Sequence, residues 1–175
     1  FKALTRRVEL VDLNNAARIK PGSPSVEGGR AALEYLDAAV DICRREDDCA
    51  LVTAPVSKEM CAAAAGSFTG HTEYLRDAFR LREVVMMMAG TFLRVVPVTR
   101  HIPLCEVSGA LRIPLIRRNL EITANALQKH FKIRAPRIAF ASANPHAGIH
   151  TFLGKEEKAI LKAIAPYREL YRLIG

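Results

Sequence analysis

The hydrophobic pattern of this chain changes period repeatedly, and the changes fall at turn-forming residues. Apolar side chains three to four residues apart are typical of a helix with one buried face, and short uninterrupted apolar runs are typical of strands covered on both faces. Their alternation predicts an α/β fold with a layered mixed sheet and flanking helices. No linker is long enough to separate two domains, so we expect residues 1–175 to form a single α/β unit.

Periodicity and capping residues together predict five helices. Ser23 is placed to cap the first helix, with Pro24 at its first helical position, while Ser57 and Thr72 are placed to cap the second and third. The expected helices are 25–46, with Leu33, Leu36, Val40 and Cys43 at helical spacing; 58–65, ended by Gly66; a helix from Thr72 with Leu75, Ala78 and Phe79 inward; 115–131, with Ile116, Leu120, Ala124, Leu127 and Phe131 on the sheet; and 155–165, ended by Pro166.

Apolar runs predict four strands. Residues 49–53 form an uninterrupted apolar run that stops at Pro55. Residues 84–89 and 93–99 are separated by three residues only, a connection compatible with a hairpin or an edge pairing in a mixed sheet. Residues 137–142 complete the set.

The charge balance indicates anionic partners. The chain has 26 Lys and Arg against 18 Asp and Glu, a net charge of +8 that suits nucleic acid, phosphorylated metabolites or an acidic protein segment. An aromatic content of 6 % without Trp argues against a stacking platform for single strands. The basic residues alternate with apolar core positions, which favours a solvated helix face, so we expect a small phosphorylated ligand and no nucleic acid.

The compartment is predicted from what the sequence lacks. No apolar stretch approaches the roughly 20 residues that span a bilayer, and the first residues do not read as a signal peptide. We expect a cytoplasmic protein that does not insert into membranes. The first residue is Phe1 and not methionine, so the chain reads as part of a longer one. Its four cysteines form no C-x-x-C pair and are expected to be free thiols.

Three of the five histidines, His71, His101 and His146, lie in loops near predicted strand ends. Neutral imidazole is a good ligand for borderline divalent ions, but a catalytic metal requires about three protein ligands. Each histidine could instead be a partly buried side chain that hydrogen-bonds its own loop. Lys58 could bind a phosphate or carboxylate together with the amides of a helix N-terminus, or be a solvated lysine.

Taken in order, these loops resemble one known family. Its motifs are matched by 53–58 (Thr-Ala-Pro-Val-Ser-Lys), 68–75 (Phe-Thr-Gly-His-Thr-Glu-Tyr-Leu), 85–90, 99–104 (Thr-Arg-His-Ile-Pro-Leu) and 144–148 (Asn-Pro-His-Ala-Gly), preceded by a similar helix at 24–32. Together they closely resemble the 4-hydroxythreonine-4-phosphate dehydrogenase family of vitamin B6 (pyridoxine) biosynthesis.

The resemblance implies a fold, a reaction and site residues. The family has an isocitrate/isopropylmalate dehydrogenase-like fold, and it is a homodimer that uses a divalent metal (Zn, Mg, Mn or Co) and NAD or NADP. It oxidises the C3 hydroxyl of 4-phosphooxy-L-threonine by hydride transfer, after which the β-keto acid loses CO2. By residue, His71 and Thr72 match the substrate-contacting pair, and His101 and His146 match two of three metal-ligating histidines. Lys58 lies in a family motif and is assigned a substrate anion contact.

The departures from the family pattern concern length and two loops. Members are roughly twice as long, so the chain would be the central part of a two-domain enzyme, without the third metal histidine and most of the cofactor pocket. Residues 149–151 (Ile-His-Thr) replace an acidic residue and two glycines, and His150 could substitute as a donor. Arg100 stands where a second threonine is usual, a cation that would disfavour a metal at His101 unless it points away.

Two alternatives remain open at the level of sequence. The chain could belong to a paralogue that oxidises another phosphorylated hydroxy acid, such as a phosphothreonate or phosphoerythronate. It could also be a truncated, non-catalytic remnant that only binds a ligand or partner.

Overall fold

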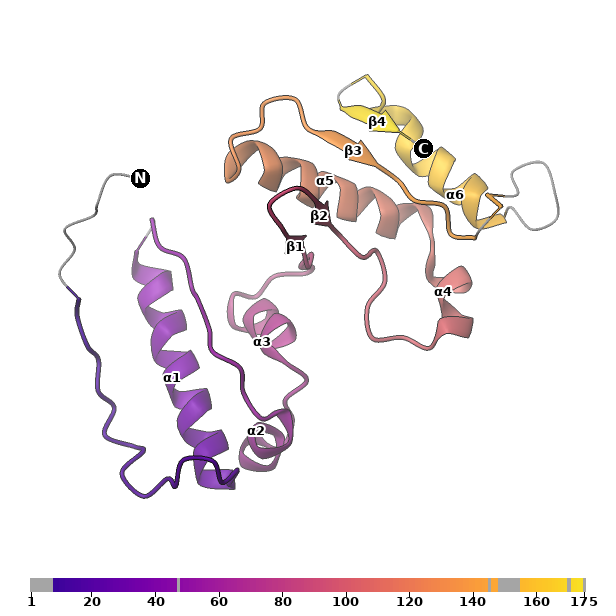
Figure 1. The fold of residues 1–175 in the computed structure, drawn as a ribbon. Coiled ribbons are helices and arrows are strands. Elements are labelled where there is room, and N and C mark those ends of the chain that lie inside the picture. Colours follow the sequence, from indigo (N-terminus) through magenta and orange to yellow (C-terminus); the bar gives the residue numbers. More distant parts are fainter. Residues whose placement is uncertain (1–7, 47, 145, 148–154, 170, 175) are drawn as a thin grey trace. The chain divides into compact units, whose positions relative to one another are not determined.

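Helices make up most of the regular structure in the computed structural model, which describes residues 8–46, 48–144, 146–147, 155–169 and 171–174 (Figure 1). The chain divides into two compact units, Phe1–Arg82 and Glu83–Gly175. The first contains α1 (Val26–Arg45), α2 (Lys58–Ala65) and α3 (His71–Ala78). The second contains β1 (Met88–Ala89), β2 (Arg94–Val95), α4 (Leu104–Ala110), α5 (Ile113–Lys129), β3 (Arg137–Ala139), α6 (Lys155–Ile164), the 3-10 turn η1 (Ala165–Tyr167) and β4 (Arg172–Ile174).

The helix α1 begins at Val26, and its N-cap lies two residues after the predicted one. Ser25 is the N-cap, and its Oγ accepts a hydrogen bond from the N–H of Gly28 at 3.1 Å. The prediction of Ser23 as the cap is therefore wrong. A capping side chain accepts from the N–H two or three residues inside the helix, and the side chain that accepts from Gly28 is Ser25. The predicted face is confirmed at Leu36 and Val40, which are buried.

Close contact between two helix backbones holds α1 against α2. A Cβ on Gly29 would lie 2.3 Å from the carbonyl oxygen of Met60, so only glycine fits at this crossing. The thiol of the buried Cys61 donates in return to the carbonyl of Gly29 at 3.7 Å. The boundaries predicted for α2 are confirmed, with Ser57 as N-cap and Gly66 in the left-handed conformation at its end.

The third helix departs from its prediction at both ends. It begins at His71 after Gly70, whose φ of 149° favours glycine, so Thr72 lies inside the first turn and is not the cap. No residue of α3 is buried. Phe79, predicted to point inward, follows the helix and is 38 % exposed, with the guanidinium of Arg44 lying 5.9 Å from its ring centroid.

The strand predicted at 49–53 is not formed. These residues belong to no strand of the described chain, and Val52 is 92 % exposed. An apolar run becomes a strand only where a neighbouring strand accepts its backbone hydrogen bonds, and no described segment pairs with this one.

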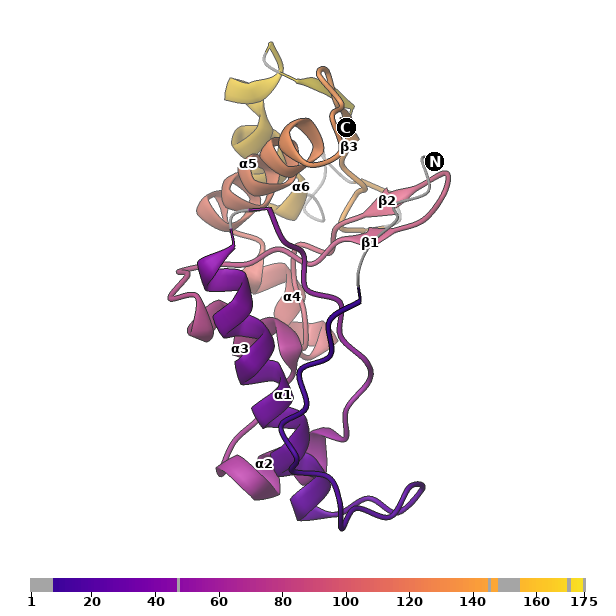
Figure 2. The ribbon, with the colours of Figure 1, turned by 90° about the vertical axis from the view of Figure 1, so that its left-hand side faces the viewer.

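The predicted hairpin in the second unit is confirmed, with shorter strands than expected. β1 pairs antiparallel with β2, with Met88 opposite Val95 and Ala89 opposite Arg94, and Figure 2 shows the two strands joined by one connection. Their side chains are exposed, as are those of Phe92 and Leu93 between them.

The core of the second unit lies between α5 and α6, which pack side by side with β3 along them (Figure 1). Ile116 and Leu120 of α5 meet Ile160, Ala163 and Ile164 of α6. These helices confirm the predictions at 115–131 and 155–165. Phe131 is the exception, since α5 ends at Lys129 and the Phe131 ring is 40 % exposed, with the Arg94 guanidinium 4.7 Å from its centroid.

The strand predicted at 137–142 is formed in part. β3 covers Arg137–Ala139 and pairs in parallel with β4, a strand that the apolar runs of the sequence do not predict. The unpredicted helix α4 has no buried residue, so it lacks the apolar face by which a helix is recognised.

These elements confirm an α/β fold in the coarse sense of mixed helix and sheet. In the described residues the sheets are two separate two-stranded pairs, not one layered sheet. None of the helices in the described part of the chain combines the length and apolar character needed to cross a bilayer.

Candidate functional site

Lys58 and the His71 loop are brought together in the first unit. Lys58 is the first residue of α2, and its Cε and Nζ lie 3.4 Å from the position that a Cβ on Gly70 would occupy. Gly70 is the N-cap of α3, and no side chain makes a capping hydrogen bond there. The ammonium therefore lies beside the start of α3, where backbone N–H groups and the helix dipole favour an anion. The carboxylate of Glu73 is also there, with Oε2 at 3.6 Å from the same Gly70 position.

The two predicted substrate residues occupy the first turn of α3 and are half-buried. The His71 ring meets the edge of Phe68, with 6.1 Å between centroids and 81° between planes. The centroid of the Phe68 ring also lies 6.0 Å from that of Tyr74. Phe68 therefore packs against the first and the fourth residue of α3. Thr72 lies next to His71 in the same turn.

A cleft of about 390 Å³ lies beside this loop, but it is not formed by the predicted substrate residues. Its lining includes Thr69, Gly70 and Glu73, together with Asp37 and Asp41 of α1 and not Lys58, His71 or Thr72. Tyr74 closes one side by donating its hydroxyl to Asp37, and desolvation by burial together with this hydrogen bond raises the pKa of Tyr74 above its usual range. Carboxylates dominate the lining, so the cleft disfavours a phosphate.

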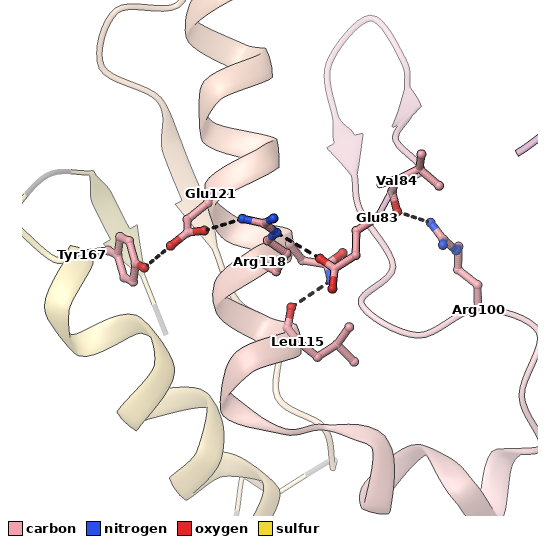
Figure 3. Close-up of polar contacts among 8 residues, drawn as sticks. Glu83, Val84, Arg100, Leu115, Arg118, Glu121 and Tyr167 are labelled. Atoms are coloured by element: carbon pink, nitrogen blue, oxygen red, sulfur yellow. Dashed lines mark hydrogen bonds and ion pairs between the residues drawn. The ribbon is translucent and has the colours of Figure 1, made fainter. Parts of the chain in front are cut away.

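The loop of His101 is anchored by its neighbour in the second unit. Arg100 donates from Nη1 to the carbonyl of Val84 at 3.0 Å, so its guanidinium is held against the segment before β1 (Figure 3). His101 is exposed and has a φ of 53°, a conformation uncommon outside glycine. The Arg100 guanidinium is thus directed to the Val84 carbonyl, where it keeps its positive charge.

Arg118 forms a neighbouring charged group, also drawn in Figure 3. Its Nε lies 3.2 Å from Glu83 Oε2 and its Nη1 lies 3.7 Å from Glu121 Oε2. Tyr167 donates its hydroxyl to Glu121, and this bond raises the pKa of Tyr167. These side chains are half exposed, so they join α5 to its surroundings without adding much free energy.

His146 is exposed in a tight turn after β3. Its backbone N–H donates to Oδ1 of Asn144 at 3.1 Å, and Ala147, with a φ of 55°, donates to the Asn144 carbonyl at 3.2 Å. Local bonding of this kind fixes the direction of the chain at His146. His150, the possible substitute donor, lies outside the described residues.

A buried carboxylate supports the His146 turn. Glu157, in the first turn of α6, is only 5 % exposed. Its Oε1 accepts hydrogen bonds from the N–H of Ala143 at 2.6 Å and from the N–H and Nδ2 of Asn144, each at 3.4 Å. No role is predicted for Glu157 from the sequence, although its spacing to Ile160 and Ile164 places an acid on the apolar face of a helix.

The two predicted metal ligands, His101 and His146, are of a type that binds divalent metals, but two ligands are fewer than a catalytic metal site requires. His101 and His146 are exposed imidazoles of the second unit. No group of three His, Cys, Asp or Glu side chains that could hold a metal occurs in the described residues. The cysteines are free, as predicted, and burial raises the pKa of the Cys61 thiol.

Comparison with protein families and relatives identifies similar proteins over most of the chain. The family model described as pyridoxal phosphate biosynthetic protein PdxA matches residues 2–174. The chain is 41 % identical over 155 residues to the 4-hydroxythreonine-4-phosphate dehydrogenase of Chromobacterium violaceum, covering 89 % of this chain and 47 % of the relative. It is 40 % identical over 161 residues to that of Desulforapulum autotrophicum, covering 92 % and 46 %.

Solved structures give the same result. A 4-hydroxythreonine-4-phosphate dehydrogenase from Burkholderia phymatum matches with a TM-score of 0.78 and 32 % identity over 96 % of this chain and 52 % of that one. The enzyme of the same name from Klebsiella pneumoniae matches with a TM-score of 0.78 and 29 % identity, covering 90 % and 49 %.

The chain spans about half the length of the relatives that it matches. The family model, in contrast, matches nearly all of it, and the histidine loops lie within the matched residues. The chain therefore belongs to the pyridoxal phosphate biosynthetic protein PdxA family.

Proposed function

We propose that this chain is the substrate- and metal-binding part of an NAD- or NADP-dependent 4-hydroxythreonine-4-phosphate dehydrogenase, which oxidises 4-phosphooxy-L-threonine in pyridoxal phosphate biosynthesis. The observation that carries the proposal is the family match over residues 2–174, which includes every predicted site residue. The names of the relatives favour this reaction over a paralogue with another substrate or a non-catalytic remnant.

In this proposal, the substrate phosphate or carboxylate binds where α2 and α3 begin. Lys58 supplies a positive charge beside Gly70, and the first-turn amides of α3 supply N–H donors. His71 and Thr72 orient the substrate from that same turn. The carboxylate of Glu73, whose Oε2 lies 3.6 Å from the same Gly70 position, opposes an anion there, and the charge of Lys58 offsets it.

His101 and His146 hold the divalent metal, with a further ligand from outside the described residues. When bound, such an ion supplies Lewis-acid chemistry to the substrate hydroxyl and to the decarboxylation that follows oxidation. Exposed imidazoles on anchored turns suit this role, since the turn and not the side chain alone sets the direction of the ring.

The finer architecture is also part of the proposal. The remaining half of the protein would complete an isocitrate dehydrogenase-like layered sheet and the nicotinamide pocket, and the enzyme would be a cytoplasmic homodimer. The exposed apolar residues of the described part, such as Val52 and Leu104, support a larger folded protein around it.

Steady-state kinetics of the full-length protein with 4-phosphooxy-L-threonine, NAD or NADP and a divalent metal test the reaction. We expect nicotinamide reduction that chelation abolishes and that His101→Ala and His146→Ala each reduce by at least about 100-fold. Lys58→Ala is expected to raise KM more than it lowers kcat, because it removes ground-state anion binding. Absence of nicotinamide reduction with this substrate, alongside turnover of another phosphorylated hydroxy acid, would contradict the proposal.

A further inference from the structure

The side chain of Glu157 is the one buried carboxylate in the described residues whose hydrogen bonds all lead to the turn of a proposed metal ligand. It belongs to α6, whose other buried residues, Ile160, Ala163 and Ile164, are apolar core. A carboxylate on such a face must be satisfied by donors to be tolerated there. Its donors come from Ala143 and Asn144, not from its own helix.

The side chain of Asn144 connects Glu157 to the backbone of His146 by hydrogen bonds. Asn144 donates its Nδ2 group to Glu157 at 3.4 Å and accepts the His146 N–H on Oδ1 at 3.1 Å. The two ends of an amide differ, since the nitrogen only donates and the oxygen only accepts. A carboxylate at 157 therefore selects the amide orientation that presents an acceptor to the His146 backbone.

From this geometry we propose that Glu157 is a positioning residue for the metal ligand His146, acting through the amide of Asn144. The inference rests on the proposed metal role of His146 and deepens it. Residues behind a metal ligand fix the direction of that ligand, and their replacement typically weakens metal affinity by about 10- to 100-fold. Glu157 would be such a residue, supplied by a helix that itself carries no ligand.

Metal affinity of the full-length protein tests the proposal directly, with Co²⁺ alone as the probe and its visible absorption as the readout. Glu157→Met keeps the size of the side chain and suits the apolar face, but it removes the acceptor. We expect it to weaken Co²⁺ binding by about 10- to 100-fold and to change the spectrum of the bound ion. Glu157→Gln retains an acceptor oxygen without the charge and should give a smaller loss.

Glu156 supplies the matched control, since it is the preceding residue of the same helix turn and bonds to Ser108 instead of the His146 loop. Glu156→Met removes the same charge and should leave Co²⁺ affinity within about twofold of the original. In a His146→Ala background, Glu157→Met should weaken binding no further, because its effect passes through the lost ligand.

The outcomes separate this inference from the proposed function. Weaker binding in His146→Ala with unchanged binding in Glu157→Met overturns the role of Glu157 alone, whereas unchanged binding in both overturns the metal role as well. An equal further loss in the His146→Ala background would show a general structural effect and would also overturn it. If Glu157→Met does not fold, Asn144→Ala breaks the same connection, and wild-type affinity in that variant refutes the proposal.

Discussion

Arg100 supports the His101 turn by a single charge-assisted hydrogen bond to the Val84 carbonyl. Replacing it with alanine removes the donor and leaves a partly buried carbonyl to water, so we expect Arg100→Ala to lower the free energy of unfolding by about 1–2 kcal/mol. Arg112→Ala is the control, because Arg112 makes a similar but exposed bond to the Gly109 carbonyl. Urea unfolding measures both, and equal losses would contradict a specific anchoring role for Arg100.

The carboxyl of Glu156 provides a pH-dependent contact at the α4–α6 side of the second unit. The hydrogen bond from Ser108 is the main cause that lowers the pKa of Glu156 below its usual value. A lowered pKa means that the folded state favours the carboxylate. The contact therefore stabilises the fold above the ordinary Glu pKa, and this stabilisation is lost as the pH falls through the lowered value.

Ser108→Ala should return the pKa of Glu156 towards its ordinary value and remove that part of the acid dependence. Titration followed by NMR of the side-chain carboxyl measures the shift. Asp77, whose pKa is lowered mainly by the hydrogen bond from Arg76, is an internal reference that should not change. A Glu156 titration that is the same with and without Ser108 would show that another group lowers this pKa.

At the scale of elements, the α1–α2 contact is set by one missing side chain. A methyl group on Gly29 would lie 2.3 Å from the backbone oxygen of Met60. A flexible side chain could relieve such a clash by changing its rotamer, but a backbone oxygen inside a helix cannot. We expect Gly29→Ala to destabilise the fold by about 1–3 kcal/mol, the range for overpacked contacts.

Gly28 is the matched control for this prediction, because it is adjacent in the same helix. A methyl group there would meet Ser25 Oγ at 3.5 Å and Ile19 at 3.7 Å, which are ordinary contacts. Gly28→Ala should leave stability unchanged or raise it by up to about 1 kcal/mol through helix propensity. Thermal or urea unfolding distinguishes the two, and equal effects would contradict the close packing of α1 on α2.

The elements also show which parts of the structure a sequence can reveal. Helices α1, α2, α5 and α6 were predictable because periodicity, caps and terminating Gly or Pro are local signals. Strand pairing is not local, so the apolar run at 49–53 was mistaken for a strand and the three-residue β4 was missed. In the site, the histidine loops were recognisable as motifs. The support from Glu157 was not, because it depends on where α6 packs.

At the scale of the whole molecule, the proposed function makes the described residues only part of a catalytic centre. They contain the substrate turn and two candidate metal ligands, but no cluster of three metal-binding side chains. We therefore expect the 175 residues alone to reduce NAD or NADP slowly or not at all with 4-phosphooxy-L-threonine. Comparison of this chain with the full-length protein, by absorbance of the reduced nicotinamide, checks the prediction. Robust turnover by the 175 residues would refute it.

The exposed apolar run at 49–53 has a consequence for how the chain avoids aggregation. A short β-prone segment with unpaired backbone groups can pair with a copy of itself while the protein is being synthesised. Glu46 and Asp48 precede the run and Pro55 follows it, and these are residue types that oppose intermolecular strand pairing. We expect these residues to act as gatekeepers that oppose such pairing. Replacing Pro55 is thus expected to increase aggregation of the chain.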